Sequence, residues 1–552
     1  MIKSLKELIP AFVLSFSFSF MLFIYEPIVL YTNNSNDFWF DLFTMIKCSL
    51  IAFFIFFFLI IFIYSIIYLI QKKIIKKKNF FNIMLIIGFI IFIVTYIQGN
   101  YLSGALPTLD GREIAWNDYT KQKIISFLLL VSVVSITLFI VKKYKYEKTI
   151  NIFKYTSYAI VVMLSVSLIS LCASNSTIIF SKKYVSTATS NYINNYSSNN
   201  NLIVLLLDSI DSQTMEDVVK NNKDYLKLFD DFTYYPNTIS GYPFTDYNVP
   251  LLLSGKWYEE EMLFHDFYNK AMDDSKMIKD LKENNYNINI YNTDFKYNTE
   301  KARIIRNLEF DSKVNVTKFI KQELKYDLFK YLPFYLKKYS KIEEMSFQDT
   351  KEEINGKDIF SWKDIDFYNN YLNLEMNISS ENEFKYIHLE GAHAPYDIDE
   401  NFNKKNNATV QDKIKASLNI IDKFLKYLKD NNVYDNSAII ILADHGFWYE
   451  DKDEDLIRRQ NPMLYIKGFN EHHERIVTDQ KVSFDYFQDI YKNLIDGKKT
   501  DTLFDNIDTT GPRKFLLYRT SGYDHLEEYY QYGNPKDLNT IKKTGVIFDL
   551  KK

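Results

Sequence analysis

"NLIVLLLD", residues 201–208, is a continuous apolar run that ends on an acid. Such a run is typical of a central parallel strand that is buried on both faces. Similar runs follow at "YNINIYNTD", "FKYIHLE", "SAIIILADHG", "PMLYIKG" and "KFLLY", and helical patterns such as "ATVQDKIKASLNIIDKFLKYLKDN" lie between them. Strands that alternate with helices predict an α/β domain with a mostly parallel central sheet.

The first part of the chain has a different composition. Five apolar segments are long enough for the roughly 20 residues of helix that a bilayer requires: 8–31, 45–70, 80–99, 124–142 and 156–177. Between these segments and the α/β domain lies a stretch rich in Ser and Asn, as linkers are. We therefore expect a transmembrane domain with five helices at 1–180, a linker at 181–200 and an extracytoplasmic catalytic domain at 201–552.

Lysine-rich connections indicate the orientation in the membrane, because connections that stay in the cytoplasm carry the basic excess. Two connections are rich in lysine, "QKKIIKKKN" (71–79) and "VKKYKYEKTINIFK" (141–154). The other two connections between the apolar segments, which begin with "TNNSNDFW" and "GNYLSG", are neutral or mixed in charge. This alternation predicts an amino terminus inside the cell, in the inner (plasma) membrane, and residues 201–552 outside.

Cysteine usage and net charge exclude several classes of function. Cys48 and Cys172 are the two cysteines of the chain, and both lie in apolar segments. The α/β part therefore has no disulfide framework, no cysteine zinc site and no cysteine nucleophile. The net charge of −3 offers no basic surface for nucleic acid.

Polar residues follow three of the predicted strands. Ligands bind beyond the carboxyl ends of the strands in sheets of this kind, and there the sequence places Asp208, then His388 and His393, then Asp444 and His445. A carboxylate from one strand and an Asp-His pair from another form a ligand set that suits a divalent ion such as zinc. Asp208 as a turn cap, and the Asp-His pair as a hydrogen-bonded turn, are the structural alternatives.

A threonine supplies a potential nucleophile. Thr245 follows a turn with Gly and Pro in "ISGYPFTDYNVPLLLSG" (239–255) and precedes an apolar stretch. We expect it at or near a helix N-terminus, where free backbone N–H groups favour anions. A purely structural role as an N-cap is the alternative. Beside a metal ion, the hydroxyl would lose its proton more readily and become a nucleophile.

These motifs together resemble the membrane-bound alkaline-phosphatase/sulfatase superfamily, within it the lipid A phosphoethanolamine transferases and lipoteichoic acid synthases. The shared features are an acid after the first strand, a threonine in a Gly-containing turn, "HLEGAH" with the spacing HxxGxH, and "DHG". The resemblance implies that Asp208, Thr245, Asp444 and His445 bind one metal, zinc or manganese, and that Thr245 is the nucleophile. It implies that His393 contacts the substrate phosphate, with His388 as a second candidate.

The chain departs from those families at two places. After "DHG" the transferases continue with a further histidine, whereas this chain reads "FWYEDKDEDLIRRQNP". Arg458 or Arg459 would replace that histidine as a phosphate clamp, since guanidinium pairs bidentately with phosphate. Sulfate-hydrolysing relatives use a Cys or Ser matured to formylglycine, followed by an arginine, and "TDYNVP" matches neither residue.

The resemblance implies an enzyme of the cell envelope. It would move phosphoethanolamine or phosphoglycerol from a phospholipid donor to a surface glycan or lipid, such as lipopolysaccharide, through a threonine intermediate. One alternative is a membrane-tethered phosphodiesterase or sulfatase-like hydrolase that uses water as the acceptor. A second alternative is a binding protein without activity on a degenerate fold.

Overall fold

The computed structural model of the chain describes residues 2–75, 79–107, 109, 114–180, 186–258, 262–310, 313–342, 346–352, 358–518 and 525–549. The chain forms two compact units. The helical unit consists of Met1–Lys183 and Val314–Lys351, and the sheet unit consists of Tyr184–Lys313 and Glu352–Lys552. Lysines 76–78 of the first lysine-rich connection and residues 181–185 of the predicted linker lie outside the described residues.

The helical unit is built mainly from long apolar helices. Its helices are α1 (Ile2–Phe20), α2 (Glu26–Asn33), α3 (Leu42–Ile70), α4 (Phe80–Tyr101), α5 (Thr120–Ser174), α6 (Ser176–Phe180) and α12 (Val316–Tyr331). Four helical segments in the described part of the chain are long and apolar enough to cross a membrane: Glu7–Asn33, Leu42–Ile74, Phe80–Tyr101 and Trp116–Ser174. These segments indicate a multi-pass membrane protein.

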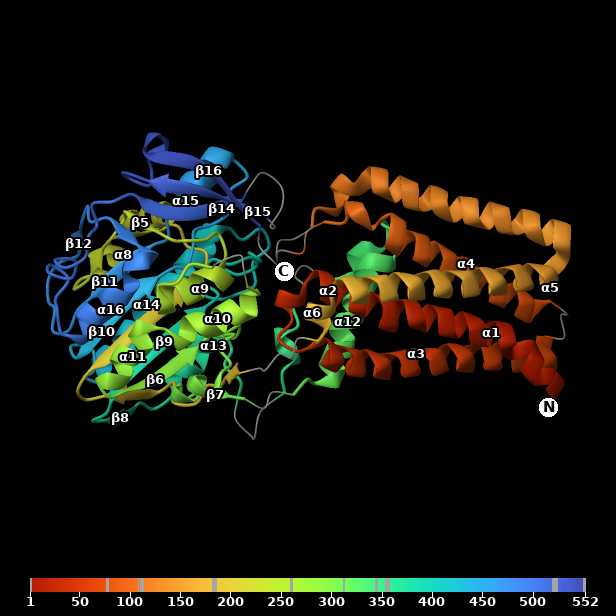
Figure 1. Cartoon of the computed structure of the whole chain (residues 1–552), viewed down its shortest axis with the longest axis horizontal. Helices are drawn as coiled ribbons and strands as arrows, with labels where there is room; N and C mark the ends of the chain where they lie inside the picture. The colour runs from red at the N-terminus through yellow and green to blue at the C-terminus, as the bar shows by residue number, and fades with distance from the viewer. Residues whose placement is uncertain are drawn as a thin grey trace. The chain divides into compact units, whose positions relative to one another are not determined.

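Helix α5 contains two of the five predicted spans. As a straight helix its 55 residues would extend roughly 83 Å, far beyond the hydrocarbon core of a bilayer. Lys145 has φ 61° and ψ 175°, so the helix breaks there, and Figure 1 shows its second half returning toward the end where α5 begins. No Gly or Pro lies between residues 141 and 154 to end a helix. The fourth and fifth predicted spans therefore lie in one helical segment, α5, and the described residues contain four candidate membrane segments instead of five.

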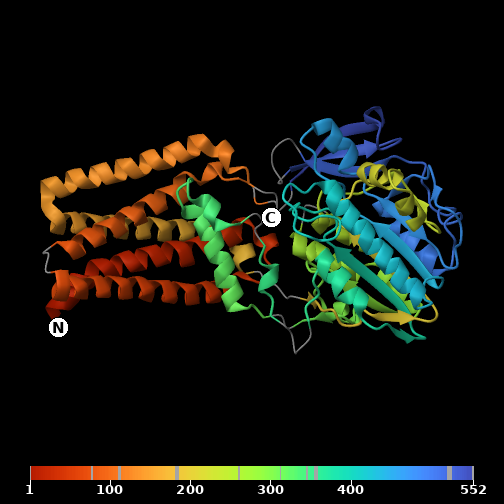
Figure 2. The same ribbon diagram turned by 180° about the vertical axis from the view of Figure 1, so that it is seen from behind.

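Helix α12 packs in the helical unit although the sequence predicted residues 314–351 as part of 201–552. Figure 2 shows α12 lying across the bundle, where it contacts α3 and α4. Lys330 Nζ lies 2.6 Å from Oε1 of Glu26, and the Tyr331 hydroxyl donates a hydrogen bond of 2.6 Å to Oε2. The Glu26 carboxylate is almost fully buried, and burial of a charge costs free energy unless the charge has partners. Lys330 and Tyr331 of α12 are those partners.

We predict that Lys330→Met destabilises the helical unit. The substitution removes the cation that pairs with the buried Glu26 carboxylate, and breaking one partner of a buried pair costs about 3–5 kcal/mol. The measurement is thermal unfolding of the full chain in detergent. The double variant Glu26→Gln/Lys330→Met, in which neither member of this pair remains charged, should recover most of the loss. Equal melting of Lys330→Met and the parent protein would contradict the prediction.

The sheet unit is organised around a mixed, mostly parallel sheet. Its order is β12-β4-β11-β10-β3-β9-β6, with β3 (Asn201–Leu207), β4 (Thr233–Tyr234), β6 (Tyr286–Tyr291), β9 (Asn382–Leu389), β10 (Ser437–Leu442), β11 (Leu464–Lys467) and β12 (Ile476–Val477). Strands β10, β3, β9 and β6 are parallel, whereas β11 is antiparallel to both of its neighbours. All seven residues of β3 are buried, which confirms the predicted central strand.

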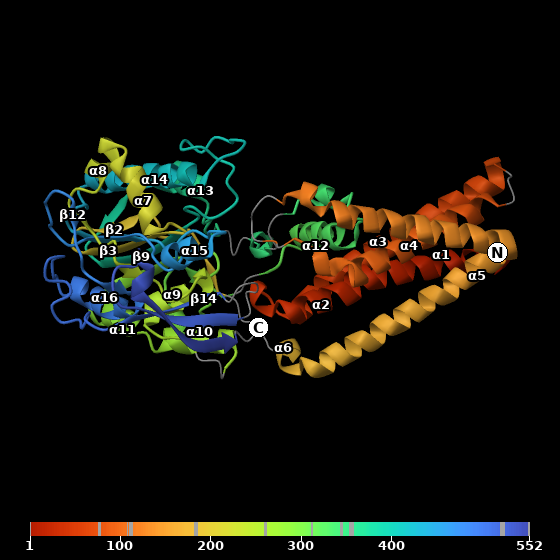
Figure 3. The same cartoon turned by 90° about the horizontal axis from the view of Figure 1, so that it is seen from above.

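Helices cover both faces of this sheet, as Figure 3 shows. One layer contains α7 (Ser212–Lys220), α8 (Lys223–Leu228), α13 (Asp364–Asn369) and α14 (Val410–Asp430). The other contains α9 (Thr245–Ser254), α10 (Phe264–Asp273), α11 (Lys276–Glu283) and α16 (Phe487–Ile495). The apolar side chains between the sheet and these layers form one continuous core. The α/β layered architecture is therefore confirmed.

Short strands complete the sheet unit. A separate antiparallel sheet contains β14 (Arg513–Tyr518), β15 (His525–Gln531) and β16 (Ile541–Asp549), so the predicted strand "KFLLY" does not belong to the central sheet. Three two-stranded pairs are β1 (Thr187–Ala188) with β7 (Leu308–Glu309), β2 (Asn195–Ser197) with β8 (Asn377–Ser379), and β13 (Val482–Ser483) with β5 (Thr238–Ile239). The described part of the predicted linker thus contributes two short strands.

Candidate metal and phosphate site

Three adjacent parallel strands carry the candidate residues at one edge of the central sheet. Strand β3 lies between β9 and β10, and Leu206 pairs with both His388 and Leu442. Asp208 follows β3, and Asp444 and His445 follow β10, so the parallel register brings the carboxyl ends of all three strands together. Ser209 and His445, which are 236 positions apart in the sequence, become neighbours in this way.

Asp208, Asp444 and His445 form a buried cluster that can hold a metal ion. One potential ligand atom from each residue lies within 4.8 Å of the others, and His445 Nε2 lies 3.3 Å from Asp444 Oδ2. That Asp444 oxygen is buried and has no hydrogen-bond partner among the described residues. Two carboxylates and an imidazole suit zinc or manganese. A buried carboxylate oxygen without a hydrogen-bond partner is expected of a residue whose partner is a metal ion. Asp208, Asp444 and His445 therefore fit a zinc or manganese ion.

The backbone around His445 orients its ring. His445 Nδ1 lies 3.0 Å from the carbonyl oxygen of Gly446, which assigns the ring proton to Nδ1 and leaves Nε2 directed at the carboxylates. The backbone N–H groups of His445 and Ser209 donate to Oδ1 of Asp444. Burial, followed by the positive charge of Arg459, lowers the pKa of His445. A neutral ring with an exposed lone pair on Nε2 is the form that binds a metal.

Thr245 is the first residue of helix α9 and faces this cluster. Its Oγ1 lies 3.3 Å from Asp208 Oδ2 and 3.5 Å from His445 Nε2. Phe244 is the N-cap and makes no side-chain capping bond, so the alternative of Thr245 as the N-cap is not what the structure has. The first-turn N–H groups of an α-helix have no partner within the helix and attract anions. A hydroxyl, a ligand cluster and an anion-binding helix end thus meet at one place.

His388 pairs with Asp208. Its Nε2 lies 3.4 Å from Asp208 Oδ2, and both side chains are buried. Burial opposes the charge on Asp208, but the hydrogen bond to His388 and the charges of His393 and His388 outweigh it and hold the pKa of Asp208 well below its usual range. Burial also opposes a charge on His388, and there the hydrogen bond and charge of Asp208 prevail and raise its pKa. Each residue therefore favours the charged form of the other.

His393 lies beyond β9 and is partly exposed. Its Nδ1 is 2.6 Å from the carbonyl oxygen of Ala394, so Nδ1 carries the ring proton when the ring is neutral and Nε2 is the atom that can meet a substrate. Trp362 packs edge-on against both His393 and His388, with ring centroids 5.6 and 6.0 Å away. Lys413 Nζ donates to the backbone oxygen of His393 at 2.7 Å. Sequence reasoning missed Trp362 and Lys413, because neither lies in a motif.

Arg458 and Arg459 have different surroundings. The Arg459 guanidinium donates to the carbonyl oxygen of Pro243, two residues before Thr245, and to that of Gly446 in the "DHG" turn. It thereby links the two loops that carry the candidate nucleophile and a candidate metal ligand. Arg458 lies 3.6 Å from Asp211 and packs over the Tyr449 ring. In this structure neither arginine contacts Thr245 or the metal cluster through any described hydrogen bond.

The sequence analysis also missed a lysine that contacts Asp246, the residue after the candidate nucleophile Thr245. Lys296 Nζ lies 2.9 Å from Asp246 Oδ2 and 3.3 Å from Asp294 Oδ2. It belongs to the loop after β6, at the same sheet edge as the metal cluster. The signal that could have found it is its position just past the predicted strand "YNINIYNTD", which the sequence analysis interpreted only as a strand.

We predict that a metal ion stabilises the sheet unit. A ligand that binds only the folded protein at 100 times its dissociation constant adds about 2.7 kcal/mol, so zinc should raise the unfolding temperature and EDTA should lower it. The measurement is thermal unfolding of the full chain, together with elemental analysis. Asp444→Asn, which weakens the ligand with the orphaned oxygen, should show little response to either reagent. An unfolding temperature of the parent protein that ignores zinc and EDTA would contradict the site.

We predict that Gly391→Ala disrupts the position of Asp208. Gly391 has φ +56°, and a Cβ there would lie 2.6 Å from the backbone N and O of Asp208. A left-handed backbone alone costs about 1–3 kcal/mol for other residues. Gly497→Ala is the matched control, because Gly497 has φ +80° but no atom within 4 Å of its Cβ position. Gly391→Ala should lose zinc affinity and more stability than the control. Equal effects of the two variants on both measurements would refute the prediction.

The comparisons with known proteins concern this part of the chain. A family model described as "Sulfatase" matches residues 200–509, which is more than half of the chain and includes every candidate residue. A search of the curated proteins found no match.

Several solved structures are similar to the chain. Ps i-CgsB in complex with k-i-k-neocarrahexaose has 16% sequence identity and a TM-score of 0.37, over 60% of this chain and 82% of that chain. An alkaline phosphatase superfamily protein from Vibrio parahaemolyticus has 12% identity and a TM-score of 0.34, over 67% and 85%. The lipoteichoic acid synthase LtaP from Listeria monocytogenes has 12% identity and a TM-score of 0.32, over 64% and 87%.

Proposed function

The chain belongs to the sulfatase family, and we propose that it is a metal-dependent phosphotransferase anchored in a membrane. It transfers a phosphoethanolamine or phosphoglycerol group from a phospholipid to a surface glycan or lipid. The observation that carries this proposal is the position of Thr245: its hydroxyl lies 3.3 Å from Asp208 and 3.5 Å from His445 at the start of helix α9. A nucleophile, a cluster that can hold a metal ion and a helix end that favours anions are parts that phosphoryl transfer uses.

The first step forms a bond between Thr245 and phosphorus. Oγ1 of Thr245 attacks the phosphodiester of the lipid and releases its proton to solvent water, because the low pKa of Asp208 makes that carboxylate a weak base. The bond from phosphorus to the diacylglycerol oxygen breaks, and His393 protonates that leaving oxygen. The product is a phosphodiester that joins Thr245 to the head group. The N–H groups at the start of α9 stabilise the negative charge that develops on the phosphoryl oxygens.

The second step reverses the roles. An acceptor hydroxyl attacks the phosphorus atom, His393 takes the proton of that hydroxyl, and Thr245 recovers its own proton as its bond to phosphorus breaks. A zinc or manganese ion held by Asp208, Thr245, Asp444 and His445 would supply Lewis acidity, which eases loss of the Thr245 proton. If water replaces the acceptor, the same site acts as a hydrolase, which is the second candidate function.

The remaining predicted residues take supporting parts in this proposal. His388 keeps Asp208 ionised and oriented through their ion pair. Arg459 holds the loops of Thr245 and His445 in place through the carbonyl oxygens of Pro243 and Gly446. Arg458 would contact a phosphate only by leaving its ion pair with Asp211.

The proposed location follows from the helices and the lysines. Four candidate membrane helices support a multi-pass protein in the plasma membrane. The lysine-rich connections at 71–79 and 141–154 favour the cytoplasmic side, so the sheet unit faces outward. An outward site gives access both to the lipid donor and to surface acceptors.

We predict that Thr245→Ala abolishes transfer, because the attacking oxygen is lost. The assay uses the full chain in vesicles that contain head-group-labelled phosphatidylethanolamine or phosphatidylglycerol, with a cell-envelope extract as acceptor. Removal of a covalent nucleophile should lower the rate by about 10³-fold or more. Thr245→Ser, which keeps the hydroxyl, should retain measurable activity and carry the mass of the head group on the substituted residue in peptide mass spectrometry.

The matched control is Thr502→Ala, since Thr502 is exposed and lies outside the site. Full transfer activity in Thr245→Ala would refute the proposal. Label that appears only as free phosphoethanolamine or phosphoglycerol would identify the hydrolase instead. A parent protein that binds stoichiometric zinc but converts neither lipid would point to a different substrate class.

A further inference from the structure

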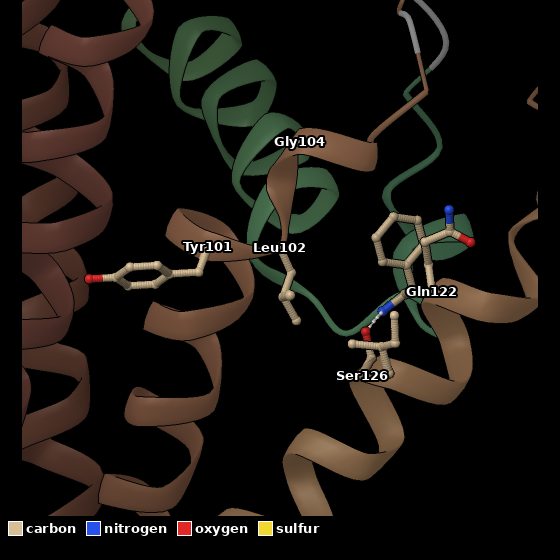
Figure 4. Close-up of a pocket in the computed structure, with 7 residues that line it drawn as sticks. Tyr101, Leu102, Gly104, Gln122 and Ser126 are labelled. Atoms are coloured by element: carbon tan, nitrogen blue, oxygen red, sulfur yellow. Dashed lines mark hydrogen bonds between the residues drawn. The ribbon is translucent and has the colours of Figure 1, made fainter.

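The helical unit contains a pocket of about 230 Å³ at one end of its bundle, shown in Figure 4. It is formed where α4 ends, where α5 begins and where the chain leaves α12. Its lining residues are Tyr101, Leu102, Gly104, Gln122, Ile125, Ser126 and Phe334. All of them belong to the helical unit, so the pocket is independent of the metal cluster in the sheet unit.

The depth of this pocket corresponds to the edge of the bilayer's hydrocarbon. Helix α4 has 22 residues and is therefore roughly 33 Å long, close to the thickness of the hydrocarbon core. Tyr101 is its last residue, and Trp116 and Tyr119 precede α5. Aromatic residues of this kind concentrate at the boundary between hydrocarbon and head groups. The ester groups and first methylenes of phospholipids occupy the same depth.

The pocket wall combines apolar side chains with unmet hydrogen-bonding capacity. The Ser126 hydroxyl donates to Gln98 Oε1 at 2.8 Å and accepts from the backbone N–H of Phe334 at 3.2 Å, the bond drawn dashed in Figure 4. Oε1 of Gln122 is buried without a hydrogen-bond partner among the described residues, so the pocket wall contains an acceptor that lacks a donor. In hydrocarbon each such group costs several kcal/mol unless a partner arrives.

We propose that this pocket binds a glycerophospholipid. The first methylenes of one acyl chain pack against Leu102, Ile125 and Phe334, and a hydrogen-bond donor of the head group, such as the ammonium of phosphatidylethanolamine or a hydroxyl of phosphatidylglycerol, reaches the unpaired Oε1 of Gln122. A mainly apolar cavity of this size holds hydrocarbon more favourably than water. The ionised carboxylate of a free fatty acid has no hydrogen to donate to Oε1 of Gln122, whereas the head groups of phosphatidylethanolamine and phosphatidylglycerol do. The inference rests on the proposed function only for its role, which is to keep a lipid of the donor class beside the enzyme.

The test is photo-crosslinking with phosphatidylethanolamine that carries a diazirine near the start of one acyl chain. The full chain is reconstituted in phosphatidylcholine vesicles with a small fraction of this probe, and labelled peptides are mapped by mass spectrometry. Label should concentrate on the peptides that contain Leu102, Ile125 and Phe334. A diazirine-bearing alkane serves as the probe without a glycerol-ester region, and it should label these peptides far less.

Two variants and a matched control test the assignment. Gly104→Trp places a large side chain where a Cβ meets nothing within 4 Å, and it should lower labelling of these peptides about tenfold. Gly511→Trp has equally open surroundings but lies in the sheet unit, and it should leave labelling unchanged. Gln122→Leu removes the amide without filling the pocket and should weaken labelling several-fold. If Gly104→Trp fails to fold, the labelling of Gln122→Leu tests the lipid pocket in its place.

Several results would overturn the proposal. These are equal labelling of the parent protein and both pocket variants, equal labelling by the alkane probe, and label spread evenly over the apolar faces of α1 and α3. Thr245→Ala should keep full labelling while it loses transfer. Loss of the crosslink therefore contradicts the lipid pocket, whereas transfer by Thr245→Ala contradicts the proposed function, and the two failures are separable.

Discussion

The parallel pairing of β3 with β9 and β10 is the constraint on which the candidate site depends. Backbone hydrogen bonds fix the register, so Leu206 lies opposite both His388 and Leu442. The residues just beyond these positions then share one edge of the sheet. A shift of one residue in either pairing would turn the side chains of that strand to the other face. The buried apolar residues of β3 resist such a shift, because both faces of the sheet are covered by helices.

Once the register is fixed, electrostatics governs the site. Two carboxylates buried close together repel each other, and burial itself disfavours their charge. The structure offsets this through His388, which pairs with Asp208, and through backbone N–H groups that donate to Asp444. The remaining unpaired oxygen of Asp444 marks where a cation completes the balance. The same charge arrangement keeps Asp208 in the ionised form, which is the form that can bind a metal ion.

The helical unit follows a different rule, since most of its surface is adapted to hydrocarbon. Large apolar side chains on α3 and α5 are exposed, whereas a soluble protein would bury them. Polar groups inside this unit therefore need partners from within the chain. Helix α12 supplies them for Glu26 through Lys330 and Tyr331. Oε1 of Gln122 lacks such a partner among the described residues, and this is one reason why we assign the pocket to a lipid.

Local patterns in the sequence determined the class of each element. Apolar runs of about 20 residues specify membrane helices, and short buried runs between helices specify a parallel sheet. The position of Asp208, Asp444 and His445 beyond strand ends was predictable for the same reason. Thr245 was predictable as the start of a helix, because a turn with Gly and Pro precedes it.

Tertiary structure alone decided which distant residues meet. Nothing local in residues 314–351 signals that α12 joins the helical unit, because its partner Glu26 lies 304 residues away from Lys330. The roles of Arg459, Trp362 and Lys296 were hidden for the same reason. The fourth and fifth predicted spans both lie in α5, on either side of the break at Lys145, so the described residues contain four candidate membrane segments where the sequence predicted five spans. Sequence determines local conformation through nearest neighbours, whereas contacts across long sequence separations exist only after the chain has folded.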